Sequence, residues 1–129
     1  MIGYGFMKKS NKSFELVVND VKENLKKEGF GILSTIDIQE KFKEKLGIDF
    51  KKYIILGACH PASAHKAIEA EENIGLMLPC NVIIYEKDNQ VIVSAIKPTA
   101  AMGMLNNPTL NQIAEDIEAK LKHVIDDIQ

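Results

Sequence analysis

Residues 78–97, LPCNVIIYEKDNQVIVSAIK, decide the fold that the sequence predicts. Apolar and β-branched side chains dominate both halves of this stretch, and Asp88-Asn89 stands between them. Two such runs joined by a pair of turn-forming residues are typical of a β-hairpin, although this turn lacks glycine. The stretch therefore predicts antiparallel strands over 78–87 and 91–97.

Further strands are predicted before this hairpin. Ile2, Tyr4 and Phe6 alternate with smaller residues, which suits a first strand with one buried face. Shorter apolar runs over 30–35 and 53–58 follow, and the second of these is typical of an interior strand. The chain thus supplies about five strands for one sheet.

Amphipathic helices alternate with the strands, and they are predicted over 13–28, 37–47, 61–71, a short segment after Pro98, and 107–128. Ser13 and Asp37 stand at helix starts, where their side chains can accept hydrogen bonds from free backbone N–H groups. The last helix has the clearest 3.6-residue period, and its apolar stripe is Leu110, Ile113, Ala114, Ile117, Leu121, Val124 and Ile128. We expect the two shorter helices after Asp37 and Pro61 to bury Ile38, Phe42, Leu46, Ala64, Ala67 and Ile68.

This order predicts one α+β domain over residues 1–129. It is a two-layer sandwich, a single sheet of about five strands with helices packed mainly on one face. The other sheet face would then form an apolar patch, and such patches usually mark interfaces. We therefore expect a homodimer, because a symmetric second copy covers that face most simply.

Composition excludes several classes of partner. The chain carries 16 basic and 18 acidic side chains, a net charge of −2. It therefore has no excess of positive charge that would attract nucleic acid or an anionic membrane. No segment approaches the roughly 20 apolar residues of a membrane span, and the N-terminal residues lack the pattern of a signal peptide. Free cysteines suit a reducing compartment, so we expect a cytoplasmic protein.

The residues most suited to chemistry stand in Cys59-His60-Pro61 and in Pro79-Cys80-Asn81. Cys59 ends a predicted strand just before a helix, whose free N–H groups attract anions and favour a thiolate. His60 could accept a proton or bind a metal. Cys80 opens another strand, so both sulfurs would share one pocket if the two strands are neighbours.

Several interpretations of these residues stay open. A metal site is disfavoured, because the sequence has no C-x-x-C motif, and we predict neither a metal nor another cofactor. A cysteine nucleophile would need a base such as His60 or His65, yet no carboxylate is evidently placed to orient either ring. A helix N-terminus could instead hold a carboxylate or phosphate without chemistry. Finally, both cysteines could be small buried hydrophobic residues.

Several segments together resemble a known family: Gly29-Phe30-Gly31, Ile36-Asp37-Ile38, Cys59-His60-Pro61 with Ala64, and residues 75–82, GLMLPCNV. Their order is similar to that of the domain-of-unknown-function family numbered 302, over nearly the whole chain. The resemblance implies a compact α+β domain that forms homodimers, with no assigned activity. It draws attention to Cys59, Pro61, Pro79, Cys80, Asn81 and Asp37. In that family Asn often follows the first cysteine, whereas this chain has His60, which weakens any role that requires a histidine there.

The sequence thus predicts a protein that binds a small anionic or thiol-reactive ligand. The predicted pocket surrounds Cys59 and Cys80, with His60, Pro61, Pro79, Asn81 and Asp37 as further ligand-binding residues. A cysteine-dependent enzyme and a purely structural homodimerisation domain with buried cysteines are the alternatives.

Overall fold

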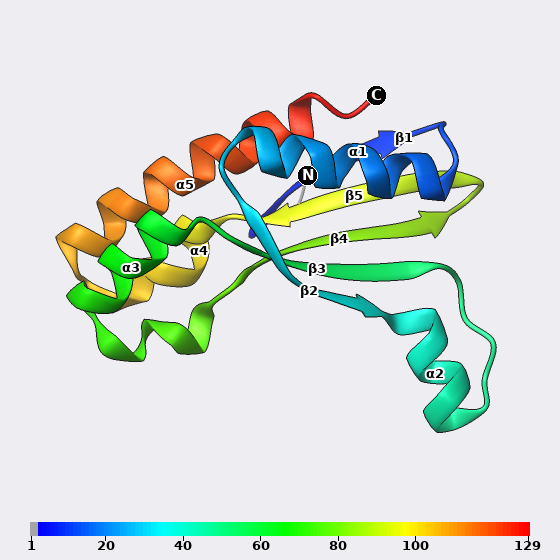
Figure 1. Ribbon diagram of the computed structural model, residues 1–129, viewed down its shortest axis with the longest axis horizontal. Helices are drawn as coiled ribbons and strands as arrows, with labels where there is room; N and C mark the ends of the chain where they lie inside the picture. The colour runs from blue at the N-terminus through cyan, green and yellow to red at the C-terminus, as the bar shows by residue number, and fades with distance from the viewer. Residues whose placement is uncertain (1–2) are drawn as a thin grey trace.

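The computed structural model describes residues 3–129 (Figure 1). The elements, in chain order, are β1 (Gly5–Ser10), α1 (Phe14–Lys27), β2 (Gly31–Asp37), α2 (Ile38–Leu46), β3 (Tyr53–Cys59), α3 (Pro61–Ala70), η1 (Glu72–Met77), β4 (Cys80–Lys87), β5 (Gln90–Ile96), α4 (Pro98–Met102), η2 (Gly103–Leu105) and α5 (Pro108–Asp126). This order confirms the predicted alternation of strands and helices. The predicted first strand included Ile2, which lies outside the described residues.

One antiparallel sheet contains all the strands in the order β1-β5-β4-β3-β2. The predicted hairpin, β4–β5, supplies two of its three interior strands. Asp88 and Asn89 both have positive φ angles, 51° and 63°, as a two-residue hairpin turn requires. Asp and Asn tolerate this conformation better than other non-glycine residues, so the turn forms without glycine.

Helices α1 and α5 cover one face of the sheet (Figure 1). The Asn24 side chain of α1 donates a hydrogen bond to the Val124 carbonyl of α5, at 3.3 Å. Between this layer and the sheet lies the main core, which includes Val17, Val21, Leu25, Leu56, Ala58, Cys80, Val82, Ile84, Val93, Ile117, Leu121 and Val124. The predicted two-layer sandwich is therefore confirmed.

A second, smaller core joins α3, η1, α4 and α5 beyond one end of the sheet. It consists of Ala67, Ile74, Met102, Leu110 and Ala114. Helix α5 is long enough to contribute to both cores, which explains its long, regular apolar stripe. The two cores meet where β3 and β4 approach α3.

Predicted helix starts are confirmed in detail. Oγ of Ser13 accepts a hydrogen bond from the Leu16 N–H, and Oδ1 of Asp37 accepts one from the Glu40 N–H at 3.0 Å. Both bonds satisfy backbone donors that have no partner within the helix.

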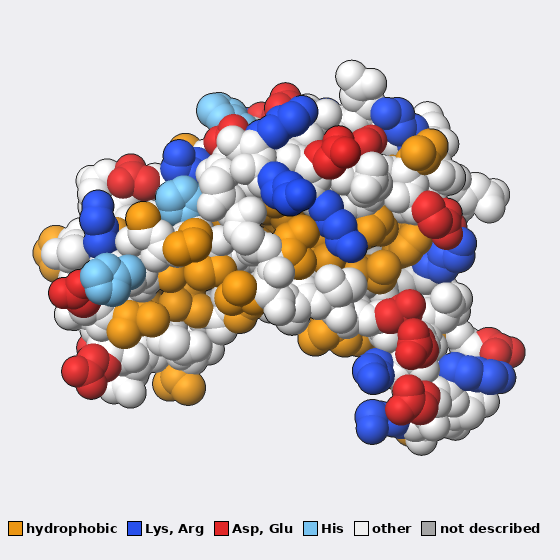
Figure 2. All heavy atoms as spheres, in the orientation of Figure 1, with side chains coloured by type: hydrophobic (Ala, Val, Ile, Leu, Met, Phe, Trp, Pro, Cys, Tyr) orange, Lys and Arg blue, Asp and Glu red, His pale blue; other side chains and the backbone are white. Residues whose placement is uncertain are grey.

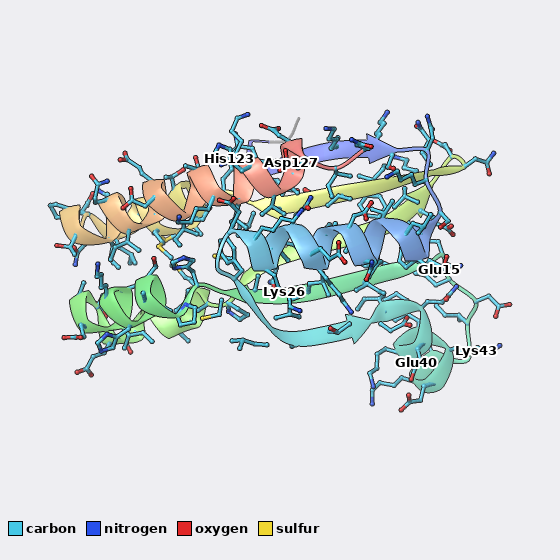
Figure 3. All side chains as sticks on the ribbon, turned by 45° about the horizontal axis from the view of Figure 1, so that its top comes forward. Glu15, Lys26, Glu40, Lys43, His123 and Asp127 are labelled. Atoms are coloured by element: carbon cyan, nitrogen blue, oxygen red, sulfur yellow. The ribbon has the colours of Figure 1, made fainter. Side chains whose placement is uncertain are left out.

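The predicted burial of two short helices is wrong in part. Helix α2 buries none of its side chains, and Leu46 is 65% exposed; on α3, Ala67 is buried but Ile68 is 43% exposed. The reason is that α2 lies beyond the end of β2, projecting away from the α1–α5 layer, so that this layer does not cover its apolar stripe (Figures 1 and 3). Phe42 instead packs against Phe50 in the following loop, with ring centroids 5.0 Å apart.

Among the described residues, no helical layer covers the sheet face opposite α1 and α5. We call it the open face; a shallow groove runs across it, lined by Tyr4, Gly5, Met7, Lys51, Tyr53, Asn81, Ile83, Tyr85, Lys87, Ser94, Ala95 and Ile96. Tyr53 and Tyr85 stack there with centroids 5.3 Å apart. The homodimer expected from such a face stays a prediction.

Candidate functional site

Strands β3 and β4 bring the two cysteines to the same end of the sheet. In the ladder between them, Ala58 lies opposite Cys80, so Cys59 is one residue further along. Strand β3 ends at Cys59 and leads directly into α3, whereas β4 begins at Cys80, immediately after a cis Leu78-Pro79 peptide bond. The sequence could not establish this adjacency, because it did not reveal the strand order.

A small cavity lies at this end of the sheet, where the two cores meet. Its lining includes Cys59, His60, Pro79 and Cys80. Its other walls come from the residue before β2, from β3, α3, α4 and α5, and from the segment before β4; they are Phe30, Ala58, Ser63, Ala64, Ala67, Leu78, Pro98, Met102, Ile113, Ala114 and Ile117. The walls are almost entirely apolar, and no lysine, aspartate or glutamate lines the cavity.

The cavity has a volume of about 30 Å³. A cavity of this size can hold a water-sized guest, but pockets for drug-sized molecules have roughly 300–1,000 Å³. Any guest that enters without rearrangement of the walls therefore has only a few heavy atoms.

His60 forms one rim of the cavity and is held by several contacts. Its Nδ1 shares a hydrogen bond with Oγ of Ser63, at 3.0 Å, and its ring meets the Phe30 ring edge-on, with centroids 5.4 Å apart. The ring also packs closely against the backbone of Gly29, since a Cβ added at Gly29 would lie only 3.0 Å from Nε2 of His60. Burial, and to a smaller extent the charge of Lys120, lowers the pKa of His60. The imidazole is therefore neutral at neutral pH.

The two thiols differ in their surroundings. Cys59 is half-buried, whereas Cys80 is buried. Burial, followed by the nearby Cys59, raises the pKa of Cys80 to about 11, so Cys80 remains a protonated thiol at neutral pH. Within residues 3–129, neither sulfur is hydrogen-bonded to a histidine or a carboxylate. A cysteine nucleophile needs such a base within hydrogen-bond reach.

Three of the residues that the sequence selected lie away from the cavity. Asp37 caps α2 at the end of β2, whereas the opposite end of β2, at Gly31, pairs with Cys59. Asn81 lies opposite Gly57 and lines the groove on the open face. Pro61 occupies the first turn of α3 and is exposed. The structure therefore brings together Cys59, His60, Pro79 and Cys80 only.

Ser63 is the polar residue that sequence reasoning missed. His60 is the N-cap of α3 and Ser63 is three residues later, the spacing at which a cap side chain and the first turn exchange hydrogen bonds. This spacing was the available signal. The sequence held no comparable signal for the apolar walls, because wall residues such as Met102 and Ile117 have the pattern of ordinary core packing.

Two further properties concern metals and membranes. Across the described chain, residues 3–129, no three His, Cys, Asp or Glu side chains converge in a way that could hold a metal ion. None of the helices in that same range combines the length and apolarity needed to cross a bilayer.

Comparison with known proteins places the chain in a family. The family model described as "Domain of unknown function DUF302" matches residues 6–128. An uncharacterized conserved DUF302 protein from Bacillus stearothermophilus, known from a crystal structure, is 31% identical; the similarity covers 99% of this chain and 100% of that one, with a TM-score of 0.92. No protein with a curated description matches the chain. Because both the family model and the solved relative span nearly its whole length, the chain belongs to the DUF302 family of domains of unknown function.

Proposed function

We propose that this DUF302 protein binds a small, uncharged, thiol-reactive molecule in the cavity between β3, β4 and α3, and that the Cys59 thiol is its contact. One observation carries the proposal. Cys59, His60, Pro79 and Cys80, from two distant chain segments, line the same cavity at the meeting point of two cores. A cavity with mostly apolar walls and a few polar groups is a typical small-molecule site.

The walls favour an uncharged guest over an anion. No cationic side chain lines the cavity, and the lowered pKa of His60 keeps that ring neutral. An anion would lose its hydration shell and gain only the N-terminus of α3 in return. Of the predicted ligand classes, anionic and thiol-reactive, the geometry therefore supports the thiol-reactive one.

Matched thiol reagents test this proposal. Methyl methanethiosulfonate is small and neutral, and its sulfonatoethyl analogue carries a negative charge. We expect the folded protein to react with the neutral reagent first at Cys59, and at least tenfold faster than with the charged one, as measured by mass spectrometry over time.

The controls are Cys59→Ser, Cys80→Ser and the urea-unfolded chain. Cys80→Ser should retain the fast reaction, Cys59→Ser should lose it, and unfolding should abolish the preference for the neutral reagent. If the folded protein resists both reagents until it is unfolded, the cysteines are core residues and the proposal is wrong.

A second candidate function, homodimerisation through the open face, is favoured by a different observation. The groove on that face is lined by apolar and aromatic residues, including Ile83, Tyr53 and Tyr85, and no helix within residues 3–129 covers it. Exposed patches of this kind on small domains usually bind another protein. A second copy covers the patch with a self-complementary surface.

Sedimentation velocity with a single substitution tests the dimer. We expect a dimer in the wild type and a monomer for Ile83→Lys, because a lysine in the middle of an apolar interface loses hydration without a partner. The control is Leu16→Lys, since Leu16 is exposed on α1, on the opposite side of the molecule. A wild type that stays monomeric at high concentration would refute the dimer.

A further inference from the structure

Both cysteines of the chain line one cavity, and their thiols differ in what surrounds them. Cys59 is half-buried at the junction of β3 and α3. Cys80 is only 9% exposed, and its thiol has no hydrogen-bond partner within residues 3–129. A buried thiol without a partner can donate a weak hydrogen bond to a guest in the cavity. The cavity therefore offers a reactive sulfur and a hydrogen-bond donor at the same place.

The volume of the cavity, about 30 Å³, sets a narrow limit on the guest. A cavity of that volume holds one water-sized molecule. Figure 2 shows hydrophobic side chains gathered on the surface between the start of α3 and the start of β4, the elements that line this cavity, so the approach also favours an uncharged guest. Of the uncharged molecules that react with a thiol, those with two heavy atoms fit best, and hydrogen peroxide is one of them.

Ser63 and Cys80 supply the polar atoms that suit a peroxide. Oγ of Ser63, which shares a hydrogen bond with Nδ1 of His60 at 3.0 Å, keeps a further lone pair that can accept another. The Cys80 S–H can donate, and both residues line the cavity. Hydrogen peroxide carries a donor and acceptors on each oxygen and can use both groups, whereas a small aldehyde has only an acceptor.

We infer that the guest is a hydroperoxide of the size of hydrogen peroxide, and that it oxidises Cys59 to a sulfenic acid. The inference rests on the proposed binding at Cys59 and names the class of molecule that binds. The Cys59 sulfur attacks one peroxide oxygen and forms an S–O bond while the O–O bond breaks; the departing hydroxide takes the thiol proton and leaves as water. Sulfur loses two electrons and the peroxide gains them. This is a single stoichiometric event, for which the intrinsic nucleophilicity of cysteine suffices without a base.

The sulfenic acid persists, because Cys80 is badly placed to displace its oxygen. In the ladder, Ala58 and not Cys59 lies opposite Cys80, whereas a disulfide needs Cβ atoms roughly 3.5–4.5 Å apart, a separation that only directly opposite residues approach. Burial, followed by the nearby Cys59, also raises the pKa of Cys80 to about 11, and the attacking species in disulfide formation is the thiolate. We therefore expect a sulfenic acid rather than a disulfide between the two cysteines.

Mass spectrometry of the folded protein treated with hydrogen peroxide tests the inference. We expect a gain of one oxygen that peptide mapping locates at Cys59 and that dithiothreitol removes, unlike the oxygen of an oxidised methionine. Cys80→Ser should retain this reversible gain, and Cys59→Ser should lose it. Cumene hydroperoxide is uncharged but far larger. With each rate divided by that of the urea-unfolded chain, it should oxidise Cys59 at least tenfold more slowly than hydrogen peroxide does.

Filling the cavity tests whether the peroxide reaches Cys59 through it. Ala64 lines the cavity, so Ala64→Leu should slow the oxidation of Cys59 at least tenfold. The matched control is Ala62→Leu, at an exposed position of the same helix outside the lining, and it should react like the wild type. Circular dichroism confirms that both variants are folded. Equal oxidation rates in the two would refute the inference.

Two outcomes separate the failure of this inference from the failure of the proposed function. A Cys59 that reacts with methyl methanethiosulfonate but not with hydrogen peroxide, or that forms a disulfide with Cys80, would refute the inference and leave the proposed binding intact. A folded protein that resists both reagents until it is unfolded would refute both.

Discussion

Gly57 shows how one residue links the sheet to the cavity. It is buried in β3, and an added Cβ would overlap Oγ of Ser34 on β2 and lie 2.9 Å from Cγ of Pro79. Only a residue without a side chain allows β2 and the Pro79 segment to approach this closely. Pro79 in turn is part of the cavity wall.

We therefore expect Gly57→Ala to lower the free energy of unfolding by about 1–3 kcal/mol, the usual cost of overpacking. Urea denaturation followed by circular dichroism measures this difference. The matched control is Gly75→Ala, because a Cβ there meets nothing within 4 Å. Adding Ser34→Gly to Gly57→Ala should recover part of the lost free energy of unfolding, because it removes the side chain that the new Cβ meets. If Gly57→Ala is as stable as the wild type, β2 and β3 separate easily and the expected overpacking is refuted.

His60 makes stability depend on pH. Burial, and then Lys120, holds its pKa below the ordinary value of 6.5 in the folded protein. The unfolded chain therefore binds more protons as the pH falls through that value, so the folded state loses stability there, and the loss is complete below the folded pKa.

The expected result is a urea midpoint that falls from about pH 7.5 to about pH 5.5 in the wild type and falls less in His60→Asn. His65 and His123 are retained in both proteins, so their contributions cancel in the comparison. Equal pH dependence in the two proteins would mean that His60 is as accessible to protons when folded as when unfolded.

At the scale of secondary structure, α5 and α2 have similar sequence patterns but differ in whether their apolar side is buried. Both are amphipathic, and both begin at a capping residue whose side chain accepts backbone hydrogen bonds. Yet α5 buries Leu110, Ala114, Ile117, Leu121, Val124 and Ile125, whereas α2 buries nothing. Periodicity therefore identifies which side of a helix is apolar, but not whether another element covers that side.

This difference predicts a contrast between two identical substitutions. Leu121→Ala should reduce the free energy of unfolding by about 2–5 kcal/mol, because a fully buried leucine leaves a cavity. Leu46→Ala in the monomer should change it by less than about 0.5 kcal/mol, because that side chain is mostly in water. Chemical denaturation at low protein concentration checks both, and similar losses would mean that α2 packs on its own chain.

On the scale of the whole molecule, one sheet face is covered and the other is open. A proposed dimer on the open face makes stability depend on concentration, because dissociation accompanies unfolding. We expect the melting temperature of the wild type to rise with protein concentration, corresponding to about 1.4 kcal/mol per mole of dimer for each tenfold increase. Differential scanning calorimetry of wild type and Ile83→Lys checks this, and a melting temperature independent of concentration in the wild type contradicts it.

The sequence predicted more of the fold than of the candidate site. The strands, the hairpin at Asp88-Asn89 and the caps Ser13 and Asp37 follow from local rules, since turn geometry and helix starts depend on residues close in the chain. The sequence also identified Cys59 and Cys80 as candidate site residues, and both line the cavity. Asp37 and Asn81 were predicted as ligand-binding residues too, but they lie outside the cavity.

By itself, then, the sequence determined the order of the strands and α-helices along the chain, the apolar side of each α-helix, and the residue types that could react. Only the tertiary structure decided that β4 lies beside β3, that Ser63 and the α5 wall enclose the cysteines, and that α2 is uncovered. The physical reason is distance along the chain. Local patterns record the preferences of neighbouring residues, whereas strand order and burial depend on contacts between segments tens of residues apart.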